Sequence, residues 1–207
     1  AEHYQFSREE QDNFSIESLQ KAKKANEDGS FRNEMVELSL LSKKGTKVIN
    51  KDEQPFKANI EKIPQLKPAF RKNGTVTAAN SSSISDGAAT VILMKESTAD
   101  KKGIKPLAKI VAHSTNSHEP NWFTTAPIGA ISKVIEKSGW KKTDIDLLEV
   151  NEAFAVVPMA VMKELSVSKE ILNINGGACA LGHPVGASGS RIVATLINNL
   201  KSRNLKR

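Results

Sequence analysis

From about residue 75 onward, short apolar runs alternate with stretches of helical periodicity, and this alternation constrains the fold more than any other feature. The runs are short and rich in branched apolar side chains, which is typical of buried β-strands. The expected strands are 88–94, 107–113, 146–150 and 171–174, and the expected helices are 127–138, 152–165 and 188–200. Strands that alternate with helices predict a layered α/β domain.

The last two helices carry further predictions. Pro158 removes one hydrogen bond from helix 152–165 and can kink it. Helix 188–200 is expected to turn its apolar side chains inward, namely Ile192, Val193, Leu196 and Leu200.

The first part of the chain, residues 1–75, is less regular and rich in lysine. Ser7 and Glu10 have the spacing of an N-terminal capping box, which predicts a helix that ends near Gly29. Phe14, Leu19, Ala22 and Ala25 follow at helical spacing along it.

A hairpin and a connection are expected after this helix. Strands 35–41 and 47–50 are predicted to pair around the turn signal Lys43-Lys44-Gly45. Residues 51–74 contain three prolines and little periodicity, so we expect an extended connection packed on another part of the chain.

The formal charge is +7 over 207 residues, and its distribution decides between two interpretations. Residues 201–207 alone hold four basic and no acidic side chains. This favours a solvated helix end whose cations lie near the negative end of the helix dipole. Attraction for an anionic ligand is the alternative. The chain has no basic stripe with interleaved aromatic residues, so we expect no nucleic-acid partner.

The composition is that of an ordinary globular protein, with 39% hydrophobic and 26% charged residues. No apolar stretch approaches the length of a membrane span, and the first residues do not form a signal peptide, so no membrane partner is expected. Cys179 is the single cysteine, which excludes an internal disulfide and a multi-cysteine metal site. We expect no metal, and a reduced, cytoplasmic location, or the mitochondrial matrix in a eukaryote.

Polar residues follow the expected strand 146–150, beginning with Asn151-Glu152. Polar side chains at the carboxyl end of a strand face the usual ligand crevice of an α/β sheet. Asn151 is also a good N-cap residue for the helix expected to follow, and spacing alone favours this capping interpretation.

Five of the fifteen residues from 175 to 189 are glycine, so the backbone here can approach a ligand closely. The segment is neither a phosphate P-loop nor a dinucleotide fingerprint. It places His183 in a glycine loop before a helix, and Pro184 restricts the backbone of His183. A structural and a catalytic role for His183 are equally open at this point.

Cys179 lies in the same loop among Ala178, Ala180 and Leu181. A thiol buried among such residues is inert, so a structural role is favoured over that of a nucleophile.

Together, these motifs resemble those of the thiolase family. Asn-Glu-Ala-Phe-Ala at 151–155 and the glycine segment at 175–189 look like the two long C-terminal signatures of the family, in the right order and spacing. The block at 75–89, which ends in Asp86-Gly87-Ala88-Ala89, is similar to a third. The resemblance runs along the whole chain.

The resemblance implies a partial thiolase fold, layered α/β/α/β/α. Residues 1–75 would be the later part of the loop domain that binds coenzyme A. Residues 76–95 would end the N-terminal half, and residues 96–207 would form a truncated C-terminal half. Thiolases exchange an acyl group between coenzyme A and a β-ketoacyl chain through a covalent acyl-cysteine.

By the same resemblance, His183 and Asn151 would be catalytic. Claisen condensation builds negative charge on a thioester oxygen, and neutral donors aimed at that oxygen lower the barrier. The family histidine donates directly and also activates the nucleophilic cysteine. The asparagine holds a water that donates too. Ser82 would meet the pantetheine arm, Gly182 would contact the coenzyme A thioester, and Phe123 would shape the acyl pocket.

The chain departs from the family in carrying neither catalytic cysteine, because Cys179 matches neither position. We therefore expect a thiolase-type acyltransferase segment for acetyl-CoA or acetoacetyl-CoA that is inactive alone. The alternative is a non-catalytic acyl-CoA-binding module or an inactive remnant. Coenzyme A thioester would be a substrate, with no bound prosthetic group. The expected protein partner is a second copy in a homo-oligomer or the missing thiolase half.

Overall fold

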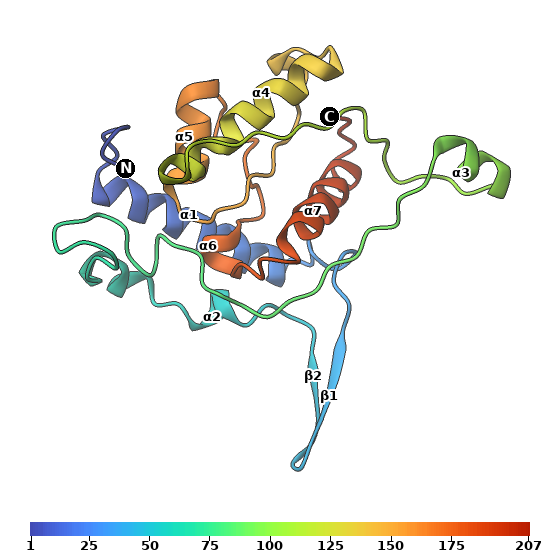
Figure 1. The fold of residues 1–207 in the computed structure, drawn as a ribbon. Helices are drawn as coiled ribbons and strands as arrows, with labels where there is room; N and C mark the ends of the chain where they lie inside the picture. The colour runs from blue at the N-terminus through green and yellow to red at the C-terminus, as the bar shows by residue number, and fades with distance from the viewer.

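A computed structural model describes all residues, 1–207. Its helices and strands follow one another along the chain as shown in Figure 1. They are α1 (Arg8–Glu27), β1 (Leu38–Ser42), β2 (Gly45–Ile49), α2 (Gln54–Lys57), η1 (Ile60–Gln65), α3 (Glu96–Lys102), η2 (Pro120–Thr125), α4 (Ala126–Ser138), η3 (Lys142–Asp144), α5 (Val156–Leu165), α6 (Ala178–Leu181) and α7 (Ser188–Ser202), where η marks a 3₁₀ helix.

Helix α1 begins and ends as predicted. Ser7 Oγ accepts a hydrogen bond from the Glu10 N–H at 3.1 Å, and Glu10 Oε2 accepts one from the Ser7 N–H at 2.7 Å. This confirms the capping box, which satisfies two backbone donors that the first turn leaves free. The helix buries Leu19, Ala22 and Ala25, so its apolar face packs against the body of the protein.

The predicted hairpin is confirmed, with shifted strand ends. Strands β1 and β2 pair antiparallel from Leu38 opposite Ile49 to Ser42 opposite Gly45. The hairpin projects from the body and is exposed along nearly its whole length (Figure 1). Two strands without a third are marginally stable in water, so this hairpin depends on a contact beyond its own pairing.

The extended connection expected for residues 51–74 is wrong in part, because this segment forms α2 and η1. Pro55 lies in the first turn of α2, where its missing N–H costs nothing. The side chain of Asn59 accepts a hydrogen bond from the Glu61 N–H and caps η1. Capping and proline position determine these helices, and both are too short to show periodicity.

Residues 88–94 and 107–113 are extended but pair with no other segment, so their prediction as β-strands is wrong. Apolar side chains in both remain accessible, for example Ile92 at 84% and Ile110 at 65%. Local sequence favours an extended backbone, whereas a strand also needs a neighbouring backbone to pair with.

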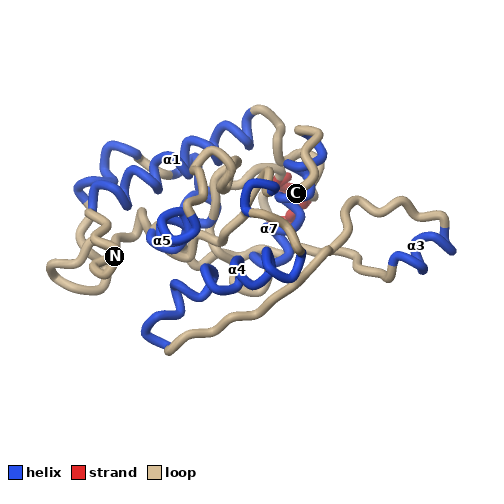
Figure 2. Tube along the Cα trace, turned by 90° about the horizontal axis from the view of Figure 1, so that it is seen from above, coloured by secondary structure: helices blue, strands red, loops and turns tan.

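Side chains hold the continuation of the second segment along α4. Ser114 Oγ donates to the Ala130 carbonyl at 2.6 Å, and Asn116 Nδ2 donates to the Ala126 carbonyl at 3.2 Å. In Figure 2 this segment runs as a tan tube beside blue α4, while α3 lies apart from the body.

The predicted strands 146–150 and 171–174 lie side by side, but they form only one parallel bridge, between Leu148 and Leu172. The Leu148 N–H donates to the Ile171 carbonyl at 2.8 Å, and the Asn173 N–H donates to the Leu148 carbonyl at 2.9 Å. Around them lies the larger apolar core. Its buried members are Val150, Val157, Val161, Leu165 and Leu172, and side chains from α1 and α4 pack against it.

Helix α5 begins at Val156 rather than at 152 as predicted. Pro158 therefore lies in the first turn, where its missing N–H would have no partner within the helix, and the expected kink has no basis.

The predicted inward face of α7 is also wrong in part. The buried residues are Ser188, Thr195 and Asn199, whereas Val193 is 41% exposed. Thr195 Oγ1 donates to Glu34 Oε1 at 2.7 Å and Asn199 Oδ1 accepts from Asn175 Nδ2 at 2.8 Å, whereas Asn199 Nδ2 has no partner in the chain.

The basic C-terminal side chains are exposed, as expected, and Lys201 lies in the last turn of α7, but Lys206 and Arg207 lie beyond the helix and fold back. Both backbone N–H groups donate to Asp146 Oδ2, at 2.8 and 3.0 Å. The Arg207 guanidinium lies 5.1 Å from the centre of the Trp140 ring, which adds a cation–π contact.

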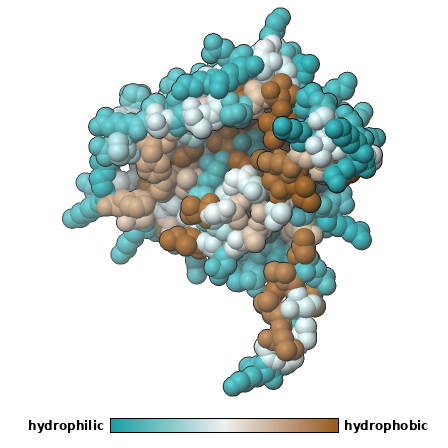
Figure 3. Space-filling model, turned by 45° about the vertical axis from the view of Figure 1, so that its right-hand side comes forward, coloured by the Kyte–Doolittle hydropathy of each residue, from teal (hydrophilic) through white to brown (hydrophobic).

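Apolar side chains gather on the surface along the hairpin and around a hollow in the body (Figure 3). Elsewhere on the surface, Ile84 is 99% exposed and Val185 76% exposed. Contiguous apolar surface of this kind marks an interaction site or an aggregation risk. None of the helices has the length and hydropathy needed to cross a membrane.

Acidic groups lie buried near Arg191 of α7. Burial raises the pKa of Glu149 to about 8, with Arg191 opposing the rise and Glu152 and Glu34 adding to it. Burial also raises the pKa of Glu34. Glu149, with its pKa near 8, retains its proton at neutral pH because the charged form would lose its hydration.

This burial predicts how stability depends on pH. Because folded Glu149 holds its proton up to about pH 8, unfolding releases a proton above the ordinary value of 4.5, and stability falls as the pH rises between these values. Glu149→Gln should reduce this loss by on the order of 3 kcal/mol in the free energy of unfolding. Urea denaturation at about pH 5 and pH 8 measures it.

Glu136→Gln, on the exposed face of α4, is the matched control and should leave the pH dependence unchanged. If the free energy of unfolding changes with pH by the same amount in Glu149→Gln and in the unaltered chain, the prediction is contradicted.

Candidate functional site

Asn151 and His183 lie next to each other although 32 residues separate them. Asn151 Nδ2 is 3.5 Å from His183 Nε2. Because α5 begins five residues later, with Ala155 as its N-cap, the capping interpretation of Asn151 is wrong. Asn151 Oδ1 is buried and has no hydrogen-bond partner in the chain, so it remains free to accept a hydrogen bond.

The imidazole of His183 is held from its other side by Ser188. His183 Nδ1 lies 2.6 Å from Ser188 Oγ, which is also 3.2 Å from the Pro184 carbonyl. The hydroxyl has one hydrogen to share. If it donates to Nδ1, then Nε2 carries the ring proton and is a donor. If it donates to Pro184, then Nδ1 carries the proton and Nε2 is an acceptor.

Ser82 joins this group through the backbone. Its N–H and its Oγ both donate to the Ala153 carbonyl, each at 3.0 Å. The neighbouring Ser83 carbonyl accepts a hydrogen bond from the His183 N–H at 2.9 Å. The segment that contains Ser82 therefore bridges the chain that follows Asn151 and the glycine loop.

Gly182 shapes the loop just before His183. Its φ of +88° lies in the region that favours glycine. A Cβ there would lie 2.6 Å from Gln54 Oε1 and would also clash with Ser85. Gly182 is buried, so its visible contribution is the close approach of these side chains.

Phe123 lies apart from this hydrogen-bonded group. It belongs to η2, its side chain is 59% exposed, and the hydrogen bonds that join Ser82, Asn151 and His183 do not include it.

Cys179 has the character of an inert thiol. Its Sγ donates to the Glu152 carbonyl at 3.7 Å. Burial, and after it the negative charge of Glu152, raise the pKa of Cys179 well above its ordinary value. The thiol is therefore protonated at neutral pH, and only a thiolate is a competent nucleophile.

A groove of about 430 Å³ is lined by residues 85–89 and by residues 184–187, which directly follow His183, whereas neither His183 nor Asn151 lines it. Its size is that of a small-molecule site. No three His, Cys, Asp or Glu side chains come together in an arrangement that fits a metal ion.

Two residues around the site were missed from the sequence, Ser188 and Asn173, and Glu152 was noted only as a polar residue after an expected strand. Ser188 lies five residues after His183, and this short separation could have indicated a contact between the two side chains. Asn173 gave none, because its side chain pairs with the Val150 backbone through a fold-dependent contact, with its own φ at +44°.

Two family models match the chain. The model described as thiolase, N-terminal domain, matches residues 1–97, and the model described as thiolase, C-terminal domain, matches residues 104–207.

Individual proteins are similar along the entire chain. A probable acetyl-CoA acetyltransferase from Dictyostelium discoideum is 46% identical over 207 residues, which is 100% of this chain and 50% of the relative. The crystal structure of the Bacillus anthracis acetyl-CoA acetyltransferase has a TM-score of 0.94 and 44% identity, and the match covers 99% of this chain and 52% of that one.

The Acat5 thiolase from Ascaris suum, solved in complex with coenzyme A, has a TM-score of 0.87 and 39% identity. This match covers 96% of this chain and 51% of that chain. The chain thus spans about half the length of the relatives it matches.

The packing of the glycine loop yields a test of its geometry. Gly177 has an extended backbone that any residue can adopt, but a Cβ there would lie 2.6 and 2.7 Å from the two carboxyl oxygens of Glu152. Gly177→Ala should therefore lower the free energy of unfolding by about 1–3 kcal/mol. Thermal and urea denaturation measure this loss.

Gly186 is the matched control in the same loop, since a Cβ there would meet nothing within 4 Å. Gly186→Ala should be neutral or slightly stabilising. Equal effects of the two substitutions would refute the close packing of Gly177.

Proposed function

Because this chain belongs to the thiolase family, we propose that it supplies the oxyanion-binding part of an acyltransferase site for coenzyme A thioesters, acetyl-CoA or acetoacetyl-CoA. It has part of the layered α/β thiolase fold. The division into a loop-domain part (1–75), the end of an N-terminal half (76–95) and a C-terminal half (96–207) is part of the proposal.

The observation that carries the proposal is the 3.5 Å approach of Asn151 Nδ2 to His183 Nε2. Two neutral polar groups from separate motifs converge, and the glycine loop that carries one of them also lines a groove of about 430 Å³. Such convergence is what an enolate oxygen requires, because donors fixed in advance need no reorganisation when charge develops.

In the proposed chemistry, a base supplied by the other part of the site takes a proton from the acetyl group, and negative charge moves onto the thioester oxygen. His183 would donate its Nε2–H to that oxygen, which requires the tautomer in which the Ser188 hydroxyl donates to Nδ1. The free Oδ1 of Asn151 would hold a water that donates to the same oxygen. Both donors are neutral, so the site stabilises the enolate without binding an anion permanently.

The remaining site residues have supporting roles in the proposal. Ser82 would contact the pantetheine arm from its position between Ala153 and the glycine loop. Gly182 would let the loop pass close to the thioester. Phe123 would border the acyl chain and limit its length, and its 59% exposure leaves it accessible to such a ligand.

The state of the only cysteine favours a second candidate, a coenzyme A-binding module that does not turn over by itself. Acyl transfer through an acyl-enzyme needs a thiolate, and the Cys179 thiol is buried with a raised pKa. The nucleophile would then come from the other half of a thiolase, or would be absent. Exposed apolar residues such as Ile92 suit either that half or a second copy of the chain.

The first functional prediction separates binding from turnover. The 207-residue chain should bind acetyl-CoA weakly in calorimetric titration and should not cleave acetoacetyl-CoA with added coenzyme A. Binding without turnover follows from an oxyanion site that lacks a thiolate. Absence of heat at millimolar acetyl-CoA would contradict the binding, and measurable cleavage would contradict the missing nucleophile.

The second functional prediction distinguishes a segment of an enzyme from a non-catalytic module. Mixing the chain with a polypeptide that spans the other half of a relative should restore thiolysis. His183→Gln should then lower that turnover by about 100- to 1000-fold, the usual cost of losing one oxyanion donor.

His118→Gln changes an exposed histidine and should leave the restored rate unaltered. No restored turnover with a folded partner would favour the non-catalytic module.

A further inference from the structure

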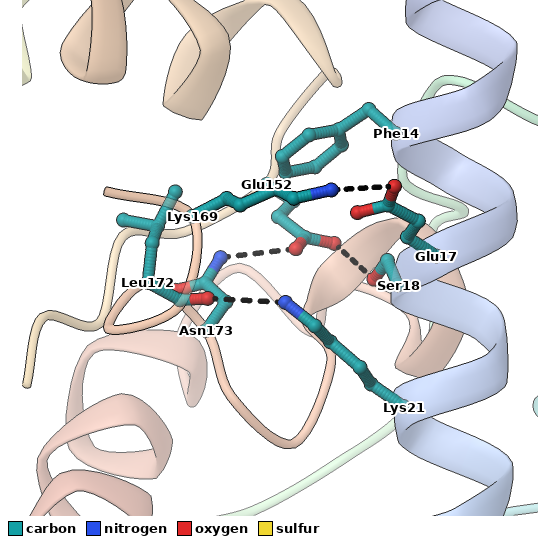
Figure 4. A pocket seen from close by; sticks show the side chains of 8 residues that line it. All are labelled: Phe14, Glu17, Ser18, Lys21, Glu152, Lys169, Leu172 and Asn173. Atoms are coloured by element: carbon teal, nitrogen blue, oxygen red, sulfur yellow. Dashed lines mark hydrogen bonds and ion pairs between the residues drawn. The ribbon is translucent and has the colours of Figure 1, made fainter. Parts of the chain in front are cut away.

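Glu152 directly follows Asn151, and its carboxyl group is enclosed by three segments of the chain (Figure 4). Only 1% of the residue is exposed. Its Oε2 accepts hydrogen bonds from Ser18 Oγ at 2.7 Å and from the Cys179 N–H at 3.1 Å, and its Oε1 accepts one from Asn173 Nδ2 at 2.9 Å. No Lys or Arg forms an ion pair with it.

Each of these partners is placed to donate to Glu152. Ser18 Oγ accepts from the Gly177 N–H at 3.0 Å, which leaves its hydroxyl hydrogen for Glu152. Asn173 Oδ1 accepts from the Val150 N–H at 2.8 Å, which fixes the NH₂ group toward Glu152. The site is therefore built for a group that accepts on both oxygens, as an ionised carboxylate does and a glutamine does not.

Burying the carboxyl group of Glu152 costs stability, and the need to fill this space does not explain why a carboxyl group is there. Burial raises the pKa of Glu152, and the hydrogen bonds from Asn173, Ser18 and Cys179 oppose that rise. An apolar side chain of similar volume often fills such a space at no loss of stability. Unlike an apolar side chain, a carboxylate forms directional hydrogen bonds and so fixes the positions of its donors.

One of the donors, the Cys179 N–H, lies four residues before His183 in the chain. Cys179 belongs to α6, a single helical turn whose C-cap Gly182 directly precedes His183. On the other side, the backbone of Glu152 continues into Asn151. One carboxylate is therefore tied to both of the segments that carry the approaching side chains.

We propose that Glu152 is a positioning residue that sets the distance between Asn151 and His183 by anchoring the start of α6. This inference rests on the proposed function for the meaning of that distance, although the distance itself can be measured without any activity. Glu152 does not touch the ligand, and it acts through the two residues that would.

The test is an NMR measurement on the complete 207-residue chain at a temperature at which each variant is folded. In the unaltered chain, a nuclear Overhauser cross-peak should join the Asn151 side-chain amide to the His183 ring. In Glu152→Gln this cross-peak should be lost and the ¹⁵N shifts of the His183 ring should move, because the glutamine NH₂ opposes one of the donors. The signals of His3, His113 and His118 should stay in place.

Glu149→Gln is the matched control, since it replaces a second buried carboxyl group, one that makes no hydrogen bond to the glycine loop. It should retain both the cross-peak and the His183 shifts. A folded Glu152→Gln that also retains them would overturn the inference.

Ser18→Ala decides the matter if Glu152→Gln does not fold, because it removes one donor and keeps the carboxylate. It should weaken the cross-peak, and an unchanged cross-peak would again overturn the inference. Acetyl-CoA titration of the unaltered chain tests the proposed function separately. The positioning role of Glu152 and the proposed function can therefore fail independently.

Discussion

The contact between helix α1 and the glycine loop determines where the site lies. Gly176 has a φ of +77°, and a Cβ at this position would lie 2.8 Å from the Ala22 backbone nitrogen. The next residue, Gly177, donates its N–H to Ser18 of the same helix. Two backbones meet here with no side chain between them, and this approach fixes the start of α6 and hence the position of His183.

Several buried side chains of this protein are polar, and their hydrogen bonds hold neighbouring segments in defined orientations. Helix α7 turns Thr195 and Asn199 inward, and the carboxyl group of Glu152 lies among donors from three segments. Apolar residues such as Ile84 and Val185 lie on the surface beside the same site. Exposed apolar side chains and the hydrogen-bonded Asn151–His183 group therefore occupy neighbouring parts of the chain.

Local signals predicted the parts of the fold that depend on neighbouring residues, whereas pairing across the chain escaped them. The capping box of α1 and the hairpin were predictable because a few adjacent residues determine each. The extended segments at 88–94 and 107–113 have strand-like sequences, but pairing depends on what lies beside them. The start of α5 was placed too early because Asn151 resembles an N-cap.

The site was predictable in its motifs and not in its supporting contacts. Asn151 and His183 belong to long sequence signatures, so the family resemblance predicted that they act at one site. Ser18 is 134 residues away from Glu152, and no pattern in the sequence relates the two. Supporting hydrogen bonds of this kind follow from the fold and become visible only in three dimensions.

The position of a bound thioester tests the central claim most directly. A crystal structure of the chain with acetyl-CoA should place the thioester oxygen within about 3 Å of His183 Nε2, on the side that faces Asn151. Acetyl-CoA bound elsewhere, or with its thioester oxygen turned away from both side chains, would contradict an oxyanion site in this chain.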